Sequence, residues 1–209
     1  MSDAPSVTTF VVEDRLPWPD DAPGLPERGP YDSAVLYDGA SQQDCSIRKI
    51  SPLGVTLQSA RQRGTGEAVA IELGTGKRSG GTVAWTGRGE IGVAFNEPVD
   101  MLALLNRKLV SQPTERRTMP RVEIRCPVHV KCGAAMIRAA LRNISANGLQ
   151  LEGDELPPQG SYVAIFVEGL NLPAGEIVWR RGNLAGVELF EEMSWTSVIP
   201  WVRSVVRKG

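Results

Sequence analysis

The amino-acid sequence predicts a mainly β protein made of two tandem, small, six-stranded antiparallel barrels, each followed by a C-terminal helix. Three observations lead to this prediction: an internal repeat, short segments in which apolar and polar residues alternate, and an apolar stripe at helical spacing after each group of such segments. The chain has 209 residues, of which 42% are hydrophobic and 22% are charged. It is therefore long enough for two small domains and apolar enough to bury a core in each.

The repeat appears when residues 47–97 are aligned without gaps on residues 141–191, a shift of 94 positions that gives 14 identities. Chance would give about three identities for sequences of ordinary composition. Trp85 falls on Trp179, for example, and Ser51 falls on Ser145. The period is far longer than that of a solenoid repeat, so the pattern predicts two copies of one domain in tandem.

Each copy is predicted to contain six short strands. In residues 122–132 every second side chain is apolar, which is typical of a strand buried on one face. Glycine, proline and asparagine separate several of the segments and indicate turns. In the second copy the strands are expected at 122–132, 135–143, 147–152, 161–168, 174–180 and 184–190. In the first copy they are expected at 33–38, 43–50, 54–58, 67–73, 80–86 and 91–95. Six antiparallel strands of this length favour a small closed barrel.

A helix is predicted after each group of strands. The apolar residues of the first helix are Val99, Leu102, Leu105 and Leu109, and those of the second are Trp195, Val198, Ile199, Val202 and Val205. Such stripes usually pack on the parent domain. Pro200 is expected to kink or interrupt the second helix, because proline lacks the N–H that a helix interior uses.

The predicted organisation has four parts. Residues 1–30 are a proline-rich acidic N-terminal arm, residues 31–110 the first barrel and helix, residues 111–121 a linker, and residues 122–209 the second barrel and helix. The arm holds six of the fifteen prolines and is expected to behave as a mobile tail, with docking of the short apolar piece Phe10–Val11–Val12 as the alternative.

Composition excludes several classes of function. The formal net charge is −1, whereas proteins that bind nucleic-acid polymers through charge are basic. No apolar run approaches the ~20 residues of a membrane span, so no membrane insertion is expected. Three cysteines and an N-terminus without an apolar signal core favour a cytoplasmic location. One histidine nearly excludes a zinc site or a catalytic triad, so we expect neither an enzyme nor a metal or cofactor.

Two short motifs carry the functional prediction. Arg117 and Arg121 form an R-x-x-x-R pair in the linker, and Asn143, Ser145 and Gly148 form an N-x-S-x-x-G run between two strands. The planar guanidinium of arginine binds phosphate oxygens and the O6/N7 edge of guanine with two parallel hydrogen bonds. Serine and asparagine add hydrogen bonds from a strand end, and a glycine lets the backbone turn and a ligand approach.

The segment that holds these motifs, residues 115–205, resembles the PilZ domain, a bacterial receptor module for cyclic di-GMP. The runs R-R-T-M-P-R and N-I-S-A-N-G match the family's two motifs in order and at the expected separation. The resemblance implies that Arg117 and Arg121 clamp phosphates and a guanine, and that Asn143, Ser145 and Gly148 contact the guanine and close the site. Arg116 is adjacent and adds charge.

The first copy departs from this pattern, because Lys49 stands where the motif has Asn143 and residues 23–27 hold no arginine pair. It is interpreted as a degenerate PilZ-like domain. The chain is therefore predicted to be a cytoplasmic cyclic di-GMP receptor, in which the nucleotide clamps the linker and reorients the two barrels toward a protein partner. The alternative is a PilZ-like scaffold without a nucleotide site. A third interpretation, a small barrel that binds single-stranded RNA, is disfavoured by the low aromatic content of 6%.

Overall fold

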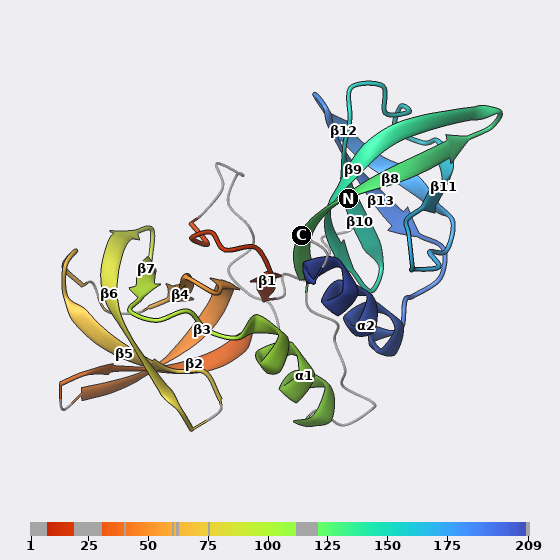
Figure 1. Cartoon of the computed structure of the whole chain (residues 1–209). Coiled ribbons are helices and arrows are strands. Elements are labelled where there is room, and N and C mark those ends of the chain that lie inside the picture. Colours follow the sequence, from red (N-terminus) through yellow and green to blue (C-terminus); the bar gives the residue numbers. More distant parts are fainter. Residues whose placement is uncertain are drawn as a thin grey trace. The chain divides into compact units, whose positions relative to one another are not determined.

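The computed structural model describes residues 8–18, 31–39, 41–59, 61, 63–74, 76–111 and 121–207. The chain divides into two compact units, Met1–Leu104 and Leu105–Gly209 (Figure 1). The first unit holds β1 (Thr9–Val11), β2 (Asp32–Asp38), β3 (Ser41–Ser51), β4 (Gly54–Gln58), β5 (Ala68–Glu72), β6 (Arg78–Gly87) and β7 (Glu90–Phe95). Helix α1 (Met101–Ser111) follows. The second unit holds β8 (Arg121–Cys132), β9 (Ala135–Ser145), β10 (Gly148–Glu152), β11 (Tyr162–Phe166), β12 (Gly175–Arg181), β13 (Leu184–Leu189) and α2 (Trp195–Val206).

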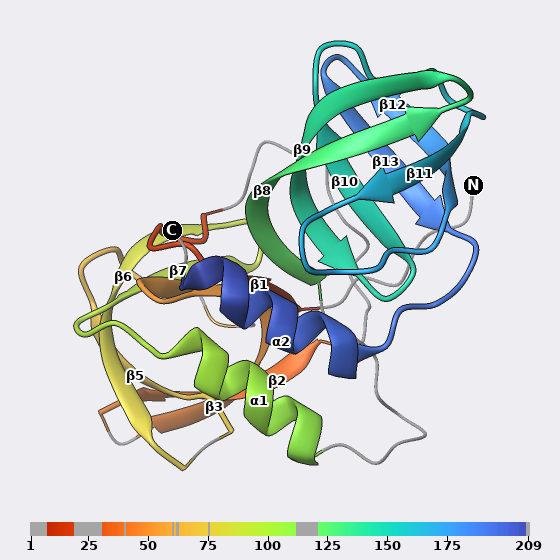
Figure 2. The ribbon, with the colours of Figure 1, turned by 45° about the vertical axis from the view of Figure 1, so that its right-hand side comes forward.

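The strands of the second unit form a closed six-stranded barrel (Figure 2). The order β11–β12–β13–β10–β9–β8 returns to β11, and every neighbouring pair is antiparallel. Closure pairs the backbone groups that an open sheet would leave at its edges. The alternation predicted for β8 is present, since Val122, Ile124, Cys126, Val128 and Val130 are buried and the residues that alternate with them are not.

Strand β9 extends two residues beyond its predicted end, to Ser145. The side chain of Ile144 is fully buried, so the end of β9 still packs on the core. Gly148 then pairs with Ser145, which leaves a two-residue hairpin loop, Ala146–Asn147. Ser145 therefore belongs to a strand, where the sequence had suggested a turn.

In the first unit β2 pairs with β3 and β5, β6 pairs with β5 and β7, and β4 pairs with β7 and β3, all antiparallel. Its irregularities match those of the second unit. Arg48 is skipped in the β3–β4 register, and Arg142, its equivalent in the repeat, is skipped in the β9–β10 register. A bulge of this kind bends a strand and increases its twist.

The expectation of a mobile N-terminal tail is wrong for residues 8–18. Strand β1 pairs in parallel with β3, with Thr9 opposite Lys49 and Phe10 opposite Ile50. Phe10 and Val11 are buried, and the Thr8 hydroxyl donates a hydrogen bond of 2.7 Å to the carbonyl of Ile47. The proline content of the arm favours a mobile tail, but the apolar residues Phe10–Val11–Val12 are enough to hold this segment on the first unit.

In each unit the indole ring of the repeated tryptophan packs against a glycine of the neighbouring strand. Trp85 pairs with Gly92 and Trp179 pairs with Gly186, and a Cβ on either glycine would lie about 2 Å from the indole nitrogen. Both tryptophans are half-buried, as expected for residues at the core or rim of each unit.

Helix α2 begins at Ser194, whose hydroxyl accepts a hydrogen bond from the Thr196 amide. The predicted interruption at Pro200 is wrong, because the helix runs through it. Pro200 is exposed, so water can satisfy the carbonyl that lacks an N–H partner. Trp201 is buried and donates a hydrogen bond of 2.9 Å to the carbonyl of Glu168. No helix in the described part of the chain is long and apolar enough to span a membrane.

Candidate functional site

The structure describes four of the six predicted ligand-binding residues. Arg121, Asn143, Ser145 and Gly148 lie on β8, β9 and β10, at the end of these strands where the β9–β10 hairpin turns. Val122 pairs with Ile144, so Arg121 and Ser145 lie at the same end of the β8–β9 ladder. Arg116 and Arg117 fall in residues 112–120, outside the described residues.

The four residues share the outer face of the barrel. Their strand neighbours Val122, Ile144 and Leu149 are buried, and side chains alternate between the two faces of a strand. Arg121, Asn143 and Ser145 are all half-exposed, so a ligand can reach them. The structure thus brings the described residues of the two motifs together on one surface.

Arg121 supplies the positive charge of this surface, and one of its hydrogen-bond donors has no acceptor among the described residues. Burial lowers the pKa of its guanidinium from the ordinary value, and the nearby carboxylate of Glu123 raises it in part. Its Nε atom is buried and has no hydrogen-bond partner among the described residues. An arginine remains charged at neutral pH, so a partly desolvated cation with an unused donor lies at the strand end. Such a group favours an anionic ligand.

Two further residues belong to the same surface and were missed by the motif analysis. Asn143 donates a hydrogen bond of 2.5 Å from its side-chain nitrogen to the side-chain oxygen of Gln150 on β10. On its other side Asn143 faces Glu123 across the β8–β9 register. Residues two apart on a strand point to the same face. Glu123 lies two residues from Arg121 and Gln150 lies two residues from Gly148, so this spacing was the signal that could have found Glu123 and Gln150.

Ser145 and Gly148 close the hairpin. The Ser145 hydroxyl donates a hydrogen bond of 3.2 Å to the carbonyl of Gly148. A Cβ on Gly148 would lie 2.6 Å from the carbonyl oxygen of Val187, a backbone atom of β13. Gly148 is therefore needed for the close approach of two strands, and a positive φ plays no part, because Gly148 is absent from the positive-φ glycines of the chain.

The corresponding face of the first unit is covered by its own N-terminal segment. By the repeat, Lys49, Ser51, Gly54 and Thr56 correspond to Asn143, Ser145, Gly148 and Gln150. Ser51 is fully buried, and the Thr56 hydroxyl donates a hydrogen bond of 2.6 Å to the carbonyl of Pro17. Thr9 lies opposite Lys49, as Glu123 lies opposite Asn143. Strand β1 thus takes the place that the first residues of β8 hold in the second unit.

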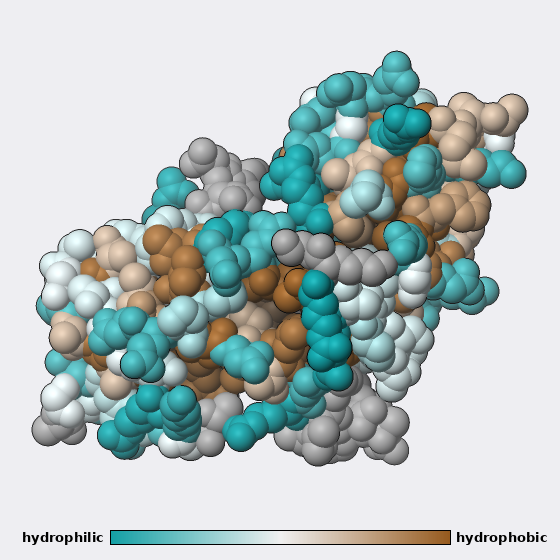
Figure 3. All heavy atoms as spheres, viewed as in Figure 1, coloured by the Kyte–Doolittle hydropathy of each residue, from teal (hydrophilic) through white to brown (hydrophobic). Residues whose placement is uncertain are grey.

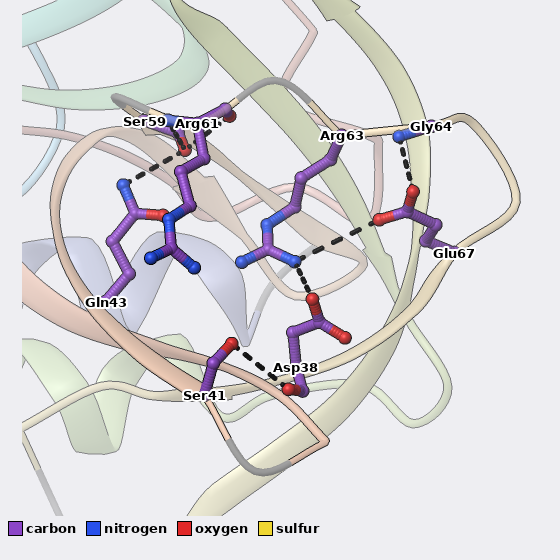
Figure 4. Close-up of polar contacts among 8 residues, drawn as sticks. All are labelled: Asp38, Ser41, Gln43, Ser59, Arg61, Arg63, Gly64 and Glu67. Carbon is purple, nitrogen blue, oxygen red and sulfur yellow. Dashed lines mark hydrogen bonds and ion pairs between the residues drawn. The ribbon is translucent and has the colours of Figure 1, made fainter.

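Another arginine cluster of the first unit was considered as a binding site (Figure 4). Arg63 is 8% exposed, and its Nη1 contacts Asp38 at 2.6 Å and Glu67 at 4.0 Å. The two carboxylates neutralise the charge of Arg63. The cluster ties the β4–β5 loop to the β2–β3 hairpin, and it offers little attraction to an anion.

Comparison with solved structures finds similar chains. The PlzA protein of Borreliella burgdorferi in complex with c-di-GMP is 11% identical, with 81% of this chain and 85% of that chain covered and a TM-score of 0.34. The Bacillus subtilis inhibitor of motility, MotI/DgrA, is 14% identical, with coverages of 85% and 96% and a TM-score of 0.29. The K. pneumonia MrkH–c-di-GMP complex is 11% identical, with coverages of 85% and 90% and a TM-score of 0.29. A comparison with curated proteins finds no match.

The family comparison agrees with the resemblance noted in the sequence. The family model described as "PilZ domain" matches residues 115–198, a range that contains both motifs and all six strands of the closed barrel. The second part of this chain, residues 115–198, is therefore a member of the PilZ domain family.

Proposed function

We propose that the chain is a cytoplasmic receptor for cyclic di-GMP and that its binding site is the outer face at the β8–β9–β10 end. The observation that carries the proposal is Arg121, whose buried Nε has no partner within the described part of the chain and which lies beside the Ser145–Gly148 hairpin of a PilZ domain. A cyclic dinucleotide supplies two phosphates and two guanine edges, and both groups suit an arginine.

The proposed roles follow from the chemistry of each side chain. Arg117 and Arg121 clamp phosphates and a guanine, and Arg116 adds positive charge. Asn143 and Ser145 offer hydrogen bonds to the guanine, and Gly148 keeps the hairpin in place through its contact with β13. We propose binding without catalysis, because the only histidine of the sequence, His129, is exposed on β8 and no acid–base pair surrounds the site among the residues that the structure describes.

We propose further that the first unit is a second, degenerate PilZ-like barrel that serves as an interface and binds no nucleotide. The skipped residues Arg48 and Arg142 and the matched Trp–Gly pairs support the common origin of the units. Residues 8–18 cover the face that holds Ser51 and Thr56, which supports the proposal that the first unit has no nucleotide site. A PilZ-like scaffold without any nucleotide site is the alternative, and titration separates the two.

Calorimetric titration of the full chain with cyclic di-GMP should show saturable binding, and Lys49→Ala should leave the affinity within about twofold of the wild type. Lys49 lies on the covered face of the first unit, so its removal should not touch the ligand. Arg181→Ala, which changes an exposed arginine of β12 outside the site, is the matched control. An absence of heat and of any thermal stabilisation by the nucleotide would favour the scaffold. If Lys49→Ala lost as much affinity for cyclic di-GMP as Arg121→Ala, the first unit would bind the nucleotide as well.

The proposed mechanism is a clamp on the linker. Cyclic di-GMP would neutralise the arginines of residues 116–121 and hold this segment against the Asn143–Gly148 edge. A ligand drives such a change only through its higher affinity for one arrangement. Ordering linker residues costs about 1–2 kcal/mol each, so the measured affinity is what remains after this cost. The two units would then present a new surface to a protein partner.

Hydrogen exchange tests the clamp. The amides of residues 112–121 should gain protection when cyclic di-GMP is added, and small-angle scattering should report a changed distance between the two units. Amides of β5, which belongs to the first unit and holds no residue of the proposed site, are the internal control and should exchange at the same rate. Binding without either change would mean that the PilZ domain binds the nucleotide passively.

A further inference from the structure

The outer face of the PilZ barrel carries an exposed apolar patch that is distinct from the nucleotide site. We define the β11 patch as Tyr162, Phe166 and Phe190. Their exposed fractions are 69%, 51% and 58%. The surface view shows tan and brown atoms gathered over this part of the second unit (Figure 3). A contiguous exposed patch of large apolar side chains is typical of an interaction surface.

Strand pairing places these side chains together. Tyr162 and Phe166 point outward from β11, because Val163 and Ile165 between them are buried. The rings of Tyr162 and Phe190 are in contact, with centroids 5.7 Å apart. On the other side Lys131 of β8 lies opposite Ala164, so its charge borders the patch there.

The two edges of the patch carry opposite charge. On the β8–β9 side Phe166 pairs with His129, and His129 pairs with Arg138, next to Lys131. On the β12–β13 side Tyr162 pairs with Glu176, and Glu176 pairs with Glu188. Glu176 and Glu188 face each other directly across neighbouring strands, an arrangement that is unfavourable unless a cation approaches. Within the described residues, none of Lys131, Arg138, Glu176 and Glu188 has an ion pair or hydrogen bond from its side chain.

We infer that the β11 patch is a self-association surface and that its partner is a second copy of this chain. A twofold axis along β11 places the cationic edge of one copy opposite the acidic edge of the other, and the apolar centre meets itself. An interface of this kind must be complementary to itself, with each contact made twice. Lys131 on β8, the apolar residues of β11 and Glu176 on β12 already have the required order of cationic, apolar and acidic groups across three neighbouring strands. A different protein would bind this face equally well only if its own surface carried the complementary order of acidic, apolar and cationic groups.

Sedimentation of the full chain without nucleotide tests this inference, because the patch contains no residue of the proposed nucleotide site. The wild type should form a reversible dimer whose fraction grows with concentration up to about 100 μM. Tyr162→Asp should remain a monomer over the same range, since it places a charge in the apolar centre of both copies. Tyr162 is 69% exposed, so the variant should keep its melting temperature. Val206→Asp, at an apolar residue of α2 that is 38% exposed, is the control and should dimerise like the wild type.

Charge reversal identifies the partner as a second copy. Lys131→Glu alone and Glu176→Lys alone should each weaken the dimer by about tenfold, because each change creates two repulsive contacts. An equimolar mixture of the two variants should recover the wild-type affinity, because the mixed dimer restores one pair and keeps the other. Arg181→Glu, outside the patch, should have no effect.

Three results would overturn the inference. The first is a wild type that stays monomeric at every concentration, and the second is a Tyr162→Asp variant that still forms the dimer. The third is a mixture of the two charge variants that associates no better than either variant alone. The last result would mean that any dimer uses another surface or another pairing of edges.

Discussion

Replacing Arg121 by alanine should weaken the binding of cyclic di-GMP by tenfold or more and leave the free protein as stable as before. A charge-assisted hydrogen bond to a phosphate contributes about 1.5–3 kcal/mol, and about 1.4 kcal/mol corresponds to a factor of ten in affinity. Among the described residues the buried Nε of Arg121 has no hydrogen-bond partner, so its removal also removes a desolvation cost. The free energy of unfolding should therefore be unchanged or slightly higher, as measured by denaturant titration.

Arg117→Ala should weaken binding to a similar degree, since the resemblance gives both arginines to the clamp. Arg181→Ala again serves as the control for the loss of one positive charge. Unchanged affinity in both Arg117→Ala and Arg121→Ala would show that the site is assigned to the wrong residues. A lowered melting temperature for Arg121→Ala would instead show that this side chain serves the fold.

Gly148→Ala should destabilise the PilZ barrel by about 1–3 kcal/mol, the usual cost of forcing an extra methyl group into packed structure. The new Cβ would lie 2.6 Å from the carbonyl oxygen of Val187, and a backbone atom in a closed barrel has little freedom to move. For a unit of this size the melting temperature should fall by roughly 10 °C. Differential scanning calorimetry measures the change directly.

Gly87→Ala is the control, because a Cβ at Gly87 would meet no atom within 4 Å. Gly54→Ala should repeat the effect in the first unit, since its Cβ would lie 2.6 Å from the carbonyl oxygen of Val93. If Gly148→Ala kept the wild-type melting temperature and lost only affinity, the glycine would serve the ligand and not the strand packing.

The strands of this protein could be predicted because inward and outward residues alternate along them. Residues Val122 to Cys132 follow the period of two without exception, and the observed β8 begins only one residue before its predicted start. The six-residue run Asn143–Gly148 placed the hairpin of the candidate site correctly between β9 and β10. Local patterns of this kind depend only on neighbours in sequence.

Contacts between distant residues could not be predicted in the same way. Glu123 and Gln150 flank Asn143 because of the register of three strands, which neither short motif reveals. The docking of Phe10 on Ile50 depends on a vacant stretch of β3 that exists only once β2 has been placed. Proline content described the composition of residues 1–30 correctly but gave no information about this vacancy.

The position of β1 also affects the order in which the two units fold. Thr9 meets Lys49 across 40 residues of chain, whereas Glu123 meets Asn143 across 20 residues, within a single hairpin. Doubling the length of a loop adds only about 0.6 kcal/mol of closure entropy, so the equilibrium cost is small. Contacts between distant residues form more slowly than local ones, however. In the PilZ barrel, Glu123 can pair with Asn143 as soon as β8 and β9 form their hairpin. In the first unit, the equivalent pairing forms only after β3 has folded and β1, which comes earlier in the chain, has docked on it.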